Sequence, residues 1–283
     1  MDQTKSAARA RLDDWRAAGF RIGLVPTMGA LHEGHLSLVK TARNHADKVI
    51  ASIFVNPKQF APGEDLDRYP RTLAADLAKL ATAGADAAYV PTANEIYPDG
   101  FQTKVEVGAL AAPLCGRSRP HFFGGVATIV CKLFTQLRPD IAVFGEKDFQ
   151  QLLIIRRMAR DLDLDVEVIG APIVRHEEGL AMSSRNSYLS KEDRARALAL
   201  PAAIRKAAEA IETGERVETA LAAAREAIST AGINDIDYLE ARRADDLRPL
   251  SDDDPAAARV FVAAMLEGAR LIDNWPIKER STT

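Results

Sequence analysis

The alternation of short apolar runs with amphipathic segments is the feature that most constrains how this chain folds. Apolar runs occur at 22–25, 49–54, 86–90, 141–144 and 166–169. Segments with the spacing of amphipathic helices lie at 5–18, 36–44, 73–83, 126–137 and 152–162. Nearly unbroken apolar strands are typical of parallel sheets that helices cover on both faces. The pattern therefore predicts an α/β fold with a doubly wound parallel sheet over the first part of the chain.

The last third of the chain has a different pattern and predicts a smaller α+β domain. We expect a helix from Ser190 to about Glu212, interrupted near Pro201, and a second helix over 217–231. Strands are expected at 236–240, 259–264 and 269–273, the last two forming a hairpin. The boundary is placed after residue 175, which gives domains 1–175 and 176–283. A further short strand is expected at 103–107, where apolar and polar residues alternate.

Composition narrows the class of protein. The chain has 283 residues and a formal charge of −3 at pH 7, whereas a dedicated nucleic-acid binder is normally basic. No apolar run reaches the roughly 20 residues of a membrane-spanning helix, and the polar segment 1–16 lacks the pattern of a signal peptide. Two isolated cysteines, Cys115 and Cys131, suit unbridged thiols in a reducing compartment. We therefore expect a cytoplasmic protein that binds neither nucleic acid nor a membrane.

The segment from Gly23 to His35 predicts a strand, a Pro/Gly turn and the start of a helix. Free backbone N–H groups at a helix N-terminus bind anions. His32 and His35 add donors that titrate near pH 7, and Gly29 and Gly34 let a ligand approach the backbone. Two nearby histidines are also common as ordinary surface or core residues, and no carboxylate or cysteine has the spacing of a metal site. The position at a strand end favours a phosphate site.

Four more polar clusters follow strand ends or precede helices. They are 55–65, 117–125, 145–151 and 179–186. Ligands of open α/β sheets bind beyond the carboxyl ends of the strands. The clusters contain amides, arginines, a lysine and hydroxyls, which suit phosphate and carboxylate groups. Turn formation, an exposed basic loop and helix capping are the alternative explanations of the individual clusters.

Four motifs together resemble those of the pantothenate synthetase family. They are PTMGALHEGH at 26–35, FVNPKQF at 54–60, FGEKDFQQ at 144–151 and MSSRN at 182–186, in the family's order and over nearly the whole chain. The first and last are similar in kind to the HIGH and KMSKS motifs of class I aminoacyl-tRNA synthetases and related nucleotidylyltransferases. The combination is far more specific than any one motif.

The resemblance implies ATP-dependent condensation of (R)-pantoate with β-alanine by an AMP-forming carbon–nitrogen ligase. In that family a pantoyl-adenylate forms with release of pyrophosphate, and the β-alanine amine then displaces AMP to give pantothenate. Donors aimed at the phosphate oxygens stabilise the charge that develops during adenylation. The resemblance also implies a Rossmann-like N-terminal domain, a C-terminal lid domain, a homodimer, and Mg²⁺ bound by the ATP phosphates.

The resemblance assigns roles to the matching positions, with no protein ligand for the metal. The catalytic residues are the proton donor His35 and the phosphate-contacting His32, Lys147 and Arg185. Pantoate is expected at Gln59, Gln151 and Arg119, and β-alanine at Gln59. The residues expected to bind ATP are Met28, Gly29, Ala30, Leu31, His32, Glu33, Gly34, His35, Gly145, Glu146, Lys147, Asp148, Val174, Met182, Ser183, Ser184 and Arg185.

The basic loop departs from the family pattern in one place. Arg119 matches the family's arginine, but the histidine stands one position early, at His121, and the usual glycine is absent. We therefore assign no role to His121.

The nearest alternative is another nucleotidylyltransferase of the same superfamily. It would share the histidine motif and the Ser/Arg loop, whereas Gln59 and Gln151 favour an acceptor with hydroxyls and a carboxylate. The short chain disfavours a class I synthetase. A non-catalytic nucleotide-binding module would not need two histidines together with Lys147 and Arg185, and the G-x-G-x-x-G fingerprint of NAD proteins is missing after the first strand.

Overall fold

The structure is a computed structural model that describes residues 1–61, 63–64 and 66–278, and its internal contacts divide the chain into two units. The first unit combines Met1–Glu146 with Gln150–Pro172, and the second combines Lys147–Phe149 with the chain from Ile173 onward. The domain boundary after residue 175 stays a prediction. The segment Lys147–Phe149 lies in the first predicted domain but groups with the second unit by its contacts.

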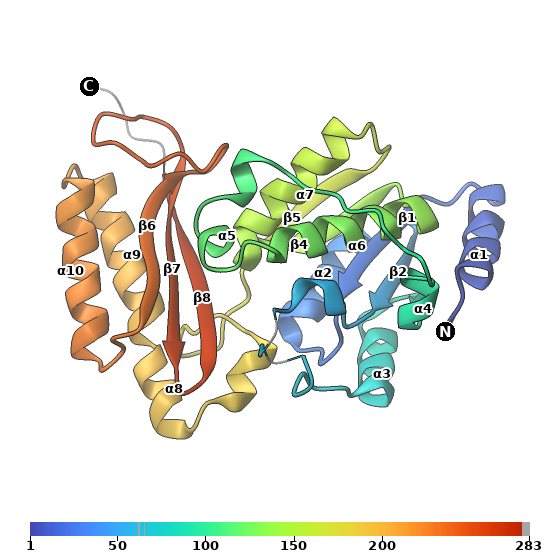
Figure 1. Cartoon of the computed structure of the whole chain (residues 1–283), viewed down its shortest axis with the longest axis horizontal. Helices are drawn as coiled ribbons and strands as arrows, with labels where there is room; N and C mark the ends of the chain where they lie inside the picture. The colour runs from blue at the N-terminus through green and yellow to red at the C-terminus, as the bar shows by residue number, and fades with distance from the viewer. Residues whose placement is uncertain (62, 65, 279–283) are drawn as a thin grey trace. The chain divides into compact units, whose positions relative to one another are not determined.

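The first unit contains a parallel sheet with the strand order β3-β2-β1-β4-β5 (Figure 1). Its strands are β1 (Ile22–Thr27), β2 (Lys48–Ile53), β3 (Ala87–Tyr89), β4 (Ile141–Gly145) and β5 (Glu167–Ala171). This confirms the predicted α/β class. The chain builds outward from β1 to one edge and then returns to start β4 on the other side. Ligands of open sheets bind at such a switch point, beyond the carboxyl ends of the two strands.

Helices pack on this sheet, and strands β1 to β4 are nearly continuously buried, as in parallel sheets that helices cover on both faces. The long ones are α1 (Lys5–Ala17), α2 (Glu33–His45), α3 (Leu73–Ala83), α6 (Phe122–Leu137) and α7 (Phe149–Asp161). Short ones are α4 (Ala93–Ile96), α5 (Cys115–Ser118), η1 (Pro57–Gln59), η2 (Ala109–Ala111) and η3 (Glu146–Asp148). α2 packs on β1 and β4 beside α3, and α1 packs against α6.

The predicted strand at 103–107 was wrong. These residues are in no strand, although their side chains alternate in polarity. The backbone N–H of Val105 donates to Oγ1 of Thr128 on α6, at 3.0 Å, instead of joining a ladder. The alternating pattern predicted strand conformation but could not supply a partner strand.

The second unit is an antiparallel sheet covered by helices, which confirms the predicted α+β architecture (Figure 1). Its elements are η4 (Ser184–Tyr188), α8 (Lys191–Ala197), α9 (Ala199–Glu212), α10 (Val217–Thr230), β6 (Ile236–Arg243), β7 (Ala258–Leu266) and β8 (Ala269–Ile277). β7 lies between β6 and β8, and the predicted hairpin is β7–β8. α9 packs on β7 and β8, and α10 packs on β6.

The helix break predicted near Pro201 occurs at Leu198 instead. Pro201 lies in the first turn of α9, where its missing N–H has no intrahelical partner to lose. The proline therefore follows the break and does not cause it.

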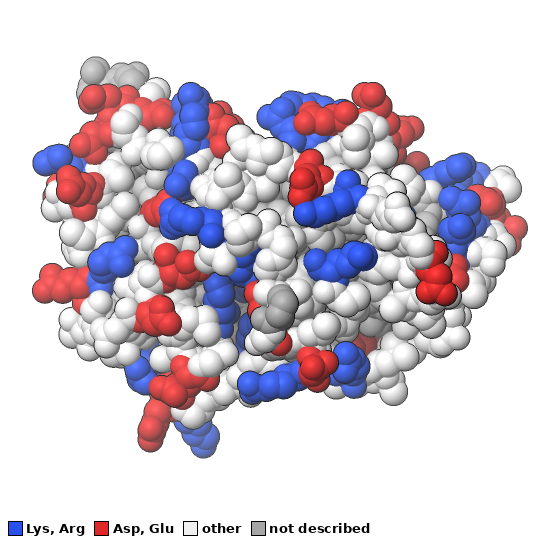
Figure 2. Space-filling view, viewed as in Figure 1, with Lys and Arg blue, Asp and Glu red and all other residues white. Residues whose placement is uncertain are grey.

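The charged side chains on the face drawn in Figure 2 are of both signs and are interspersed, in keeping with the small formal charge of −3. Among the residues that the structure describes, no helix is long and apolar enough to cross a membrane.

Candidate active site

A buried carboxylate on α3 holds the loop that follows β1. Asp76, which is 1% exposed, accepts hydrogen bonds from the backbone N–H groups of Ala30 at 3.0 Å and Leu31 at 2.8 Å. Gly29 (φ 85°) and Ala30 (φ 52°) both have left-handed backbone conformations. A carboxylate that accepts two backbone N–H bonds is a strong local restraint. It stabilises a loop conformation that the sequence of the loop alone would not favour.

His32 and His35 cap the N-terminus of α2 reciprocally. Nδ1 of His32 accepts from the N–H of Gly34 at 3.1 Å, and Nδ1 of His35 accepts from the N–H of His32 at 3.4 Å. The two ring centroids are 4.1 Å apart. Because Nδ1 accepts in both rings, the neutral imidazoles carry their proton on Nε2. Each ring therefore presents an N–H donor on the side opposite its cap.

Most backbone N–H groups of residues 28–35 already have partners within the first unit. Besides the amides held by Asp76 and by the two histidines, Gly29 N–H donates to Oγ1 of Thr27 at 3.3 Å and His35 N–H to the His32 carbonyl at 2.8 Å. The expectation of free N–H groups was wrong at these positions, because a buried carboxylate and two imidazoles already accept their hydrogen bonds. The assignment of 28–35 to ATP stays a prediction, and it rests on the side chains more than on the amides.

Gln59 is oriented by a chain of buried hydrogen bonds. The Tyr97 hydroxyl donates to Oδ1 of Asn56 at 2.7 Å, and Nδ2 of Asn56 donates to Oε1 of Gln59 at 3.0 Å. Nε2 of Gln59 then faces Sδ of Met28 at 3.0 Å. Asn56 is 1% exposed and Gln59 is 8% exposed. Burial raises the pKa of the Tyr97 hydroxyl well above its usual range, so it stays a donor.

Gly125 on α6 permits this arrangement. A Cβ at Gly125 would lie 2.2 Å from the carbonyl oxygen of Lys58 and 2.8 Å from Cα of Gln59. Its own carbonyl accepts from Nδ2 of Asn56 at 3.1 Å. The helix therefore touches the backbone of η1 directly, and only glycine allows this separation.

Arg119 lies against Glu64 and the backbone of Gln59. Its Nε and Nη2 donate to the two carboxylate oxygens of Glu64 at 2.7 and 2.5 Å, and Nη2 also donates to the Gln59 carbonyl at 3.2 Å. The guanidinium stacks over the ring of Phe122, 3.9 Å from its centre. Burial opposes ionisation of Glu64, but Arg119 outweighs it and holds the pKa of that carboxyl below its ordinary value. In the described contacts, Arg119 supports the backbone that carries Gln59.

The two glutamines at the start of α7 have different surroundings. Gln150 is 5% exposed; it accepts from Cys115 N–H at 3.2 Å and donates to the carbonyls of Leu110 and Pro113 at 2.9 and 2.7 Å. These bonds anchor a loop. Gln151 is partly exposed and follows β4, whose last residue is Gly145. Gln151 remains the predicted pantoate ligand of the pair.

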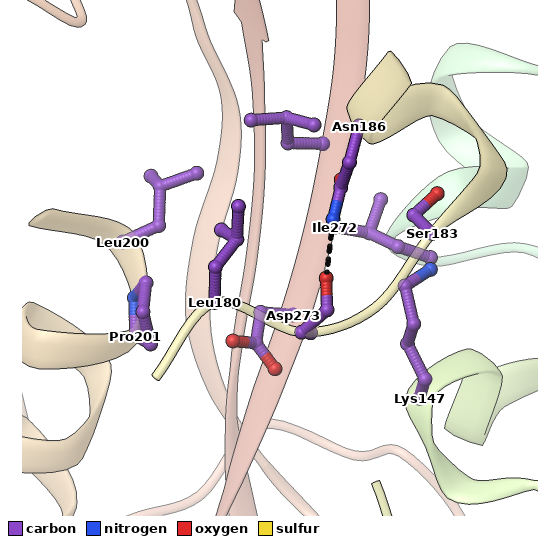
Figure 3. A pocket seen from close by; sticks show the side chains of 10 residues that line it. Lys147, Leu180, Ser183, Asn186, Leu200, Pro201, Ile272 and Asp273 are labelled. Atoms are coloured by element: carbon purple, nitrogen blue, oxygen red, sulfur yellow. Dashed lines mark hydrogen bonds between the residues drawn. The ribbon is translucent and has the colours of Figure 1, made fainter. Parts of the chain in front are cut away.

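In the second unit, a small pocket brings Lys147 together with the Ser/Arg loop and with β8 (Figure 3). Lys147, Ser183, Asn186 and Asp273 are the polar residues that line it. Asn186 is 8% exposed and donates from Nδ2 to the Ala181 carbonyl at 3.0 Å. The Oδ1 atom of Asn186 is buried and accepts no hydrogen bond from the residues that the structure describes. A buried acceptor of this kind calls for a donor from a ligand or from water.

The predicted nucleotide residues from Val174 to Arg185 form a compact turn. The Val174 carbonyl accepts from Met182 N–H at 3.0 Å. Ser183 caps η4, since its Oγ accepts from Arg185 N–H at 3.2 Å. Just after this loop, Ser190 caps α8, since its Oγ accepts from Asp193 N–H at 3.1 Å. This confirms the helix cap that was the structural alternative, and the role of Arg185 stays a prediction.

Sequence reasoning missed several residues that position the predicted ones. Asp76, Tyr97 and Gly125 hold the groups of the first unit, and Asn274 contacts Lys147 in the second. Each acts on a residue far away in the sequence, so no local pattern identifies it. The one available signal was the pair Gly124–Gly125 in a helix start, where glycine is otherwise costly.

Comparisons with known proteins agree over the whole chain. The sequence matches the family described as "Pantoate-beta-alanine ligase" over residues 1–276. A relative from Caulobacter vibrioides named pantothenate synthetase is 54% identical over 277 residues, which cover 97% of each chain.

Solved structures give the same result. The pantothenate synthetase of Thermus thermophilus has a TM-score of 0.93 at 48% identity, covering 98% of this chain and 100% of its own. A pantoate–β-alanine ligase from Francisella tularensis, described as complexed with "Beta-gamma ATP and Beta-alanine", has a TM-score of 0.81 at 33% identity, covering 96% and 95%.

These similarities extend over nearly the full length of the chain and of its relatives. They favour ATP-dependent ligation of pantoate to β-alanine over another nucleotidylyltransferase activity. The chain belongs to the pantoate–β-alanine ligase family.

Proposed function

We propose that this ligase joins (R)-pantoate to β-alanine in two steps, through a pantoyl-adenylate. The observation that carries the proposal is the 3.0 Å contact between Nε2 of Gln59 and Sδ of Met28. It sets the amide predicted to hold pantoate beside the loop predicted to hold ATP, within one unit. Substrates bound by these two groups are neighbours, which is the condition for direct attack of one on the other.

In the first step, a carboxylate oxygen of pantoate attacks the α-phosphorus of ATP. The bond from that phosphorus to the β-phosphate oxygen breaks, and pyrophosphate leaves. Lys147 and Arg185 neutralise charge on the phosphate oxygens, and His32 and His35 stabilise it with hydrogen bonds from Nε2, that of His35 to the leaving group. Positioning and charge neutralisation supply most of the catalysis in phosphoryl chemistry of this type.

In the second step, the amine of β-alanine attacks the carbonyl carbon of the adenylate. The bond from that carbon to the AMP oxygen breaks, the amine loses a proton, and pantothenate and AMP are released. Gln59 and Gln151 hold the pantoyl group through both steps. Arg119 contributes through Gln59, whose carbonyl oxygen it holds at 3.2 Å.

Nucleotide binding involves both predicted domains, 1–175 and 176–283. The first contributes residues 28–35 and 145–148, and the second contributes Met182–Arg185 as part of a lid. Val174 contacts adenine through its backbone, and Asp148 holds the ribose.

Mg²⁺ is part of the proposal and is held mainly by the ATP phosphates. Among the described residues, no cluster of three or more His, Cys, Asp or Glu side chains could hold a metal, and Mg²⁺ on a triphosphate uses only one or two carboxylates. When bound, the ion neutralises phosphate charge.

We also propose that the ligase is a cytoplasmic homodimer. Cys115 and Cys131 are both in the thiol form, which suits a reducing compartment. Strand β5 is at the edge of its sheet and is only partly buried over most of its length. A second copy of the chain would cover such an edge.

The test is to measure pyrophosphate and AMP separately. Pyrophosphate release should require pantoate and ATP only, whereas pantothenate formation should also require β-alanine. Equal pyrophosphate release without pantoate, or with phosphopantetheine in its place, would overturn the assignment. Gln59→Ala should raise the pantoate KM with little change in the ATP KM, and an unchanged pantoate KM would remove Gln59 from the site.

A further inference from the structure

Asn274 on β8 makes a buried contact with the backbone of Lys147. Its Nδ2 donates to the Lys147 carbonyl at 3.0 Å, and the residue is 1% exposed. Its Oδ1 accepts from Nε of Arg259 at 2.6 Å. A carbonyl can only accept and a guanidinium can only donate, so the two partners fix which end of the amide is which. Asn274 is thus a single-orientation bridge between Lys147 and Arg259.

Arg259, the other partner of Asn274, contacts Phe149, the first residue of α7. Arg259 is 9% exposed, and its guanidinium lies over the ring of Phe149, 4.3 Å from the ring centre. Phe149 also packs against Phe261, with ring centres 6.1 Å apart. Asn274 and Arg259 together hold the segment from Lys147 to Phe149 at its backbone and at its aromatic side chain. This explains why the segment groups with the second unit.

The neighbouring residue on β8 holds the predicted nucleotide turn. Asp273, 5% exposed, pairs with Arg175 through two hydrogen bonds of 2.6 and 2.9 Å. Arg175 follows Val174 and also donates to the Gly179 carbonyl at 3.1 Å. The Asp273 carboxylate accepts from the N–H of Asn274 at 2.8 Å, which couples the two residues. Two adjacent residues of one strand therefore hold both phosphate-binding segments predicted for this unit.

We propose that Asn274, with Asp273, is a positioning residue for adenylation that sets Lys147 and the 174–185 turn in mutual register. This rests on the proposed role of Lys147 at the ATP phosphates. The burial of Asn274 and Asp273 supports this positioning role. A buried amide and a buried carboxylate stabilise a structure only when every partner is in place. A shift of the Lys147 backbone moves the ammonium group relative to Ser183, which lines the same pocket.

The decisive variant is Asn274→Asp. It keeps the size of the side chain and the acceptor for Arg259, but it replaces the donor to Lys147 by a carboxylate oxygen that faces a carbonyl oxygen. Pantoate-dependent pyrophosphate release should fall about tenfold or more, because misplacement of a catalytic group by about 1 Å costs up to 10²-fold. In a Lys147→Ala background the same substitution should change the rate less than about twofold, since residues that act through one another are non-additive.

The matched control is Asp237→Asn. Asp237 pairs with Arg270 in the same sheet, its side chain is 19% exposed, and neither residue lines the pocket. This variant should lose stability without losing pyrophosphate release. Arg259→Lys provides a second variant if Asn274→Asp fails to fold, and it should show the same dependence on Lys147.

Hydrogen exchange makes the outcome independent of the assigned reaction. Asn274→Asp should accelerate exchange of the amides in 147–149, whereas Asp237→Asn should not. Unchanged exchange in that segment, or an equal rate loss with and without Lys147, overturns the positioning role. A wild-type enzyme that releases pyrophosphate without pantoate overturns the proposed reaction instead, and the exchange result still decides the role of Asn274.

Discussion

His32 and His35 each accept a backbone N–H at Nδ1 and so cap the N-terminus of α2 reciprocally. The catalytic role that we propose for them would use Nε2. Replacing a histidine with asparagine or glutamine separates its capping role from its proposed catalytic role. An asparagine side chain places an acceptor near the position of Nδ1, whereas a glutamine reaches the position of Nε2 with a donor. The pair of variants therefore tests capping and catalysis independently at His35.

We expect His35→Asn to lower kcat about 10²-fold, as loss of a transition-state donor does, with stability changed by less than about 0.5 kcal/mol because the cap is kept. His35→Gln should keep more activity and lose about 1 kcal/mol of stability with the cap. Steady-state kinetics and urea unfolding measure the two effects. Near-normal turnover in His35→Asn would indicate that Lys147 and Arg185, and not His35, stabilise the charge on the phosphates.

Tyr97→Phe removes the first donor of the chain that orients Gln59. We expect the pantoate KM to rise about five- to tenfold, the value of a lost buried hydrogen bond, while the ATP KM stays unchanged. Tyr89→Phe is the control, because the Tyr89 hydroxyl is also buried and donates to Gln136 at 3.0 Å, and burial raises its pKa to about 12. Tyr89→Phe should affect only stability, and equal effects of the two variants on pantoate would contradict the orienting role.

Neighbouring glycines of α6 give a comparison within one helix. Gly125→Ala sets a Cβ 2.2 Å from the Lys58 carbonyl oxygen, so η1 and Gln59 must shift. Gly124→Ala meets mainly the end of the flexible Lys104 side chain, with Cε at 2.6 Å. We expect Gly125→Ala to lose about 1–3 kcal/mol of stability by overpacking and to raise the pantoate KM. Gly124→Ala should change neither appreciably. A normal pantoate KM in soluble Gly125→Ala would show that η1 tolerates the shift.

The ion pair between Glu64 and Arg119 gives a pH-dependent term in stability. The folded-state pKa of Glu64 lies below the ordinary value of 4.5. A lowered folded pKa stabilises the protein fully above about pH 4.5, and the contribution is lost as the pH falls through the folded pKa.

Glu64→Gln should therefore cost about 1–2 kcal/mol at pH 7, the value of charged hydrogen bonds, and progressively less below pH 4.5. Urea unfolding at several pH values measures the difference. Glu218→Gln is the control, since the Glu218 side chain is 85% exposed and should have no such effect. A constant difference between wild type and Glu64→Gln from pH 7 to acid would contradict the ion-pair explanation.

The sequence was sufficient to predict the architecture, because periodicity and helix ends are local properties. The helix at 73–83 has the predicted bounds, since Gly84 ends it with a left-handed conformation (φ 90°). The start of α2 was predicted three residues late because a histidine is not a usual N-cap, yet His32 accepts from Gly34 N–H there. Local patterns could not show that 103–107 has no partner strand.

The site was harder to predict because its supports are remote in sequence. Asn274 and Lys147 are 127 positions apart, and Tyr97 and Asn56 are 41 apart. Composition and spacing could identify Gln59 and Lys147 as chemically suitable groups. They could not show which buried donors and acceptors orient them, because those partners are chosen by tertiary packing.

The carboxylate of Asp76 also sets an order of events during synthesis. It lies 46 residues after Ala30, whose backbone N–H it accepts. At ribosomal rates of about 5–20 residues per second, Asp76 is added roughly 2–9 seconds after that loop. A nascent chain arrested before α3 can contain β1 but has no acceptor for the Ala30 and Leu31 amides. The loop after β1 can therefore reach its final conformation only after the ribosome has synthesised α3.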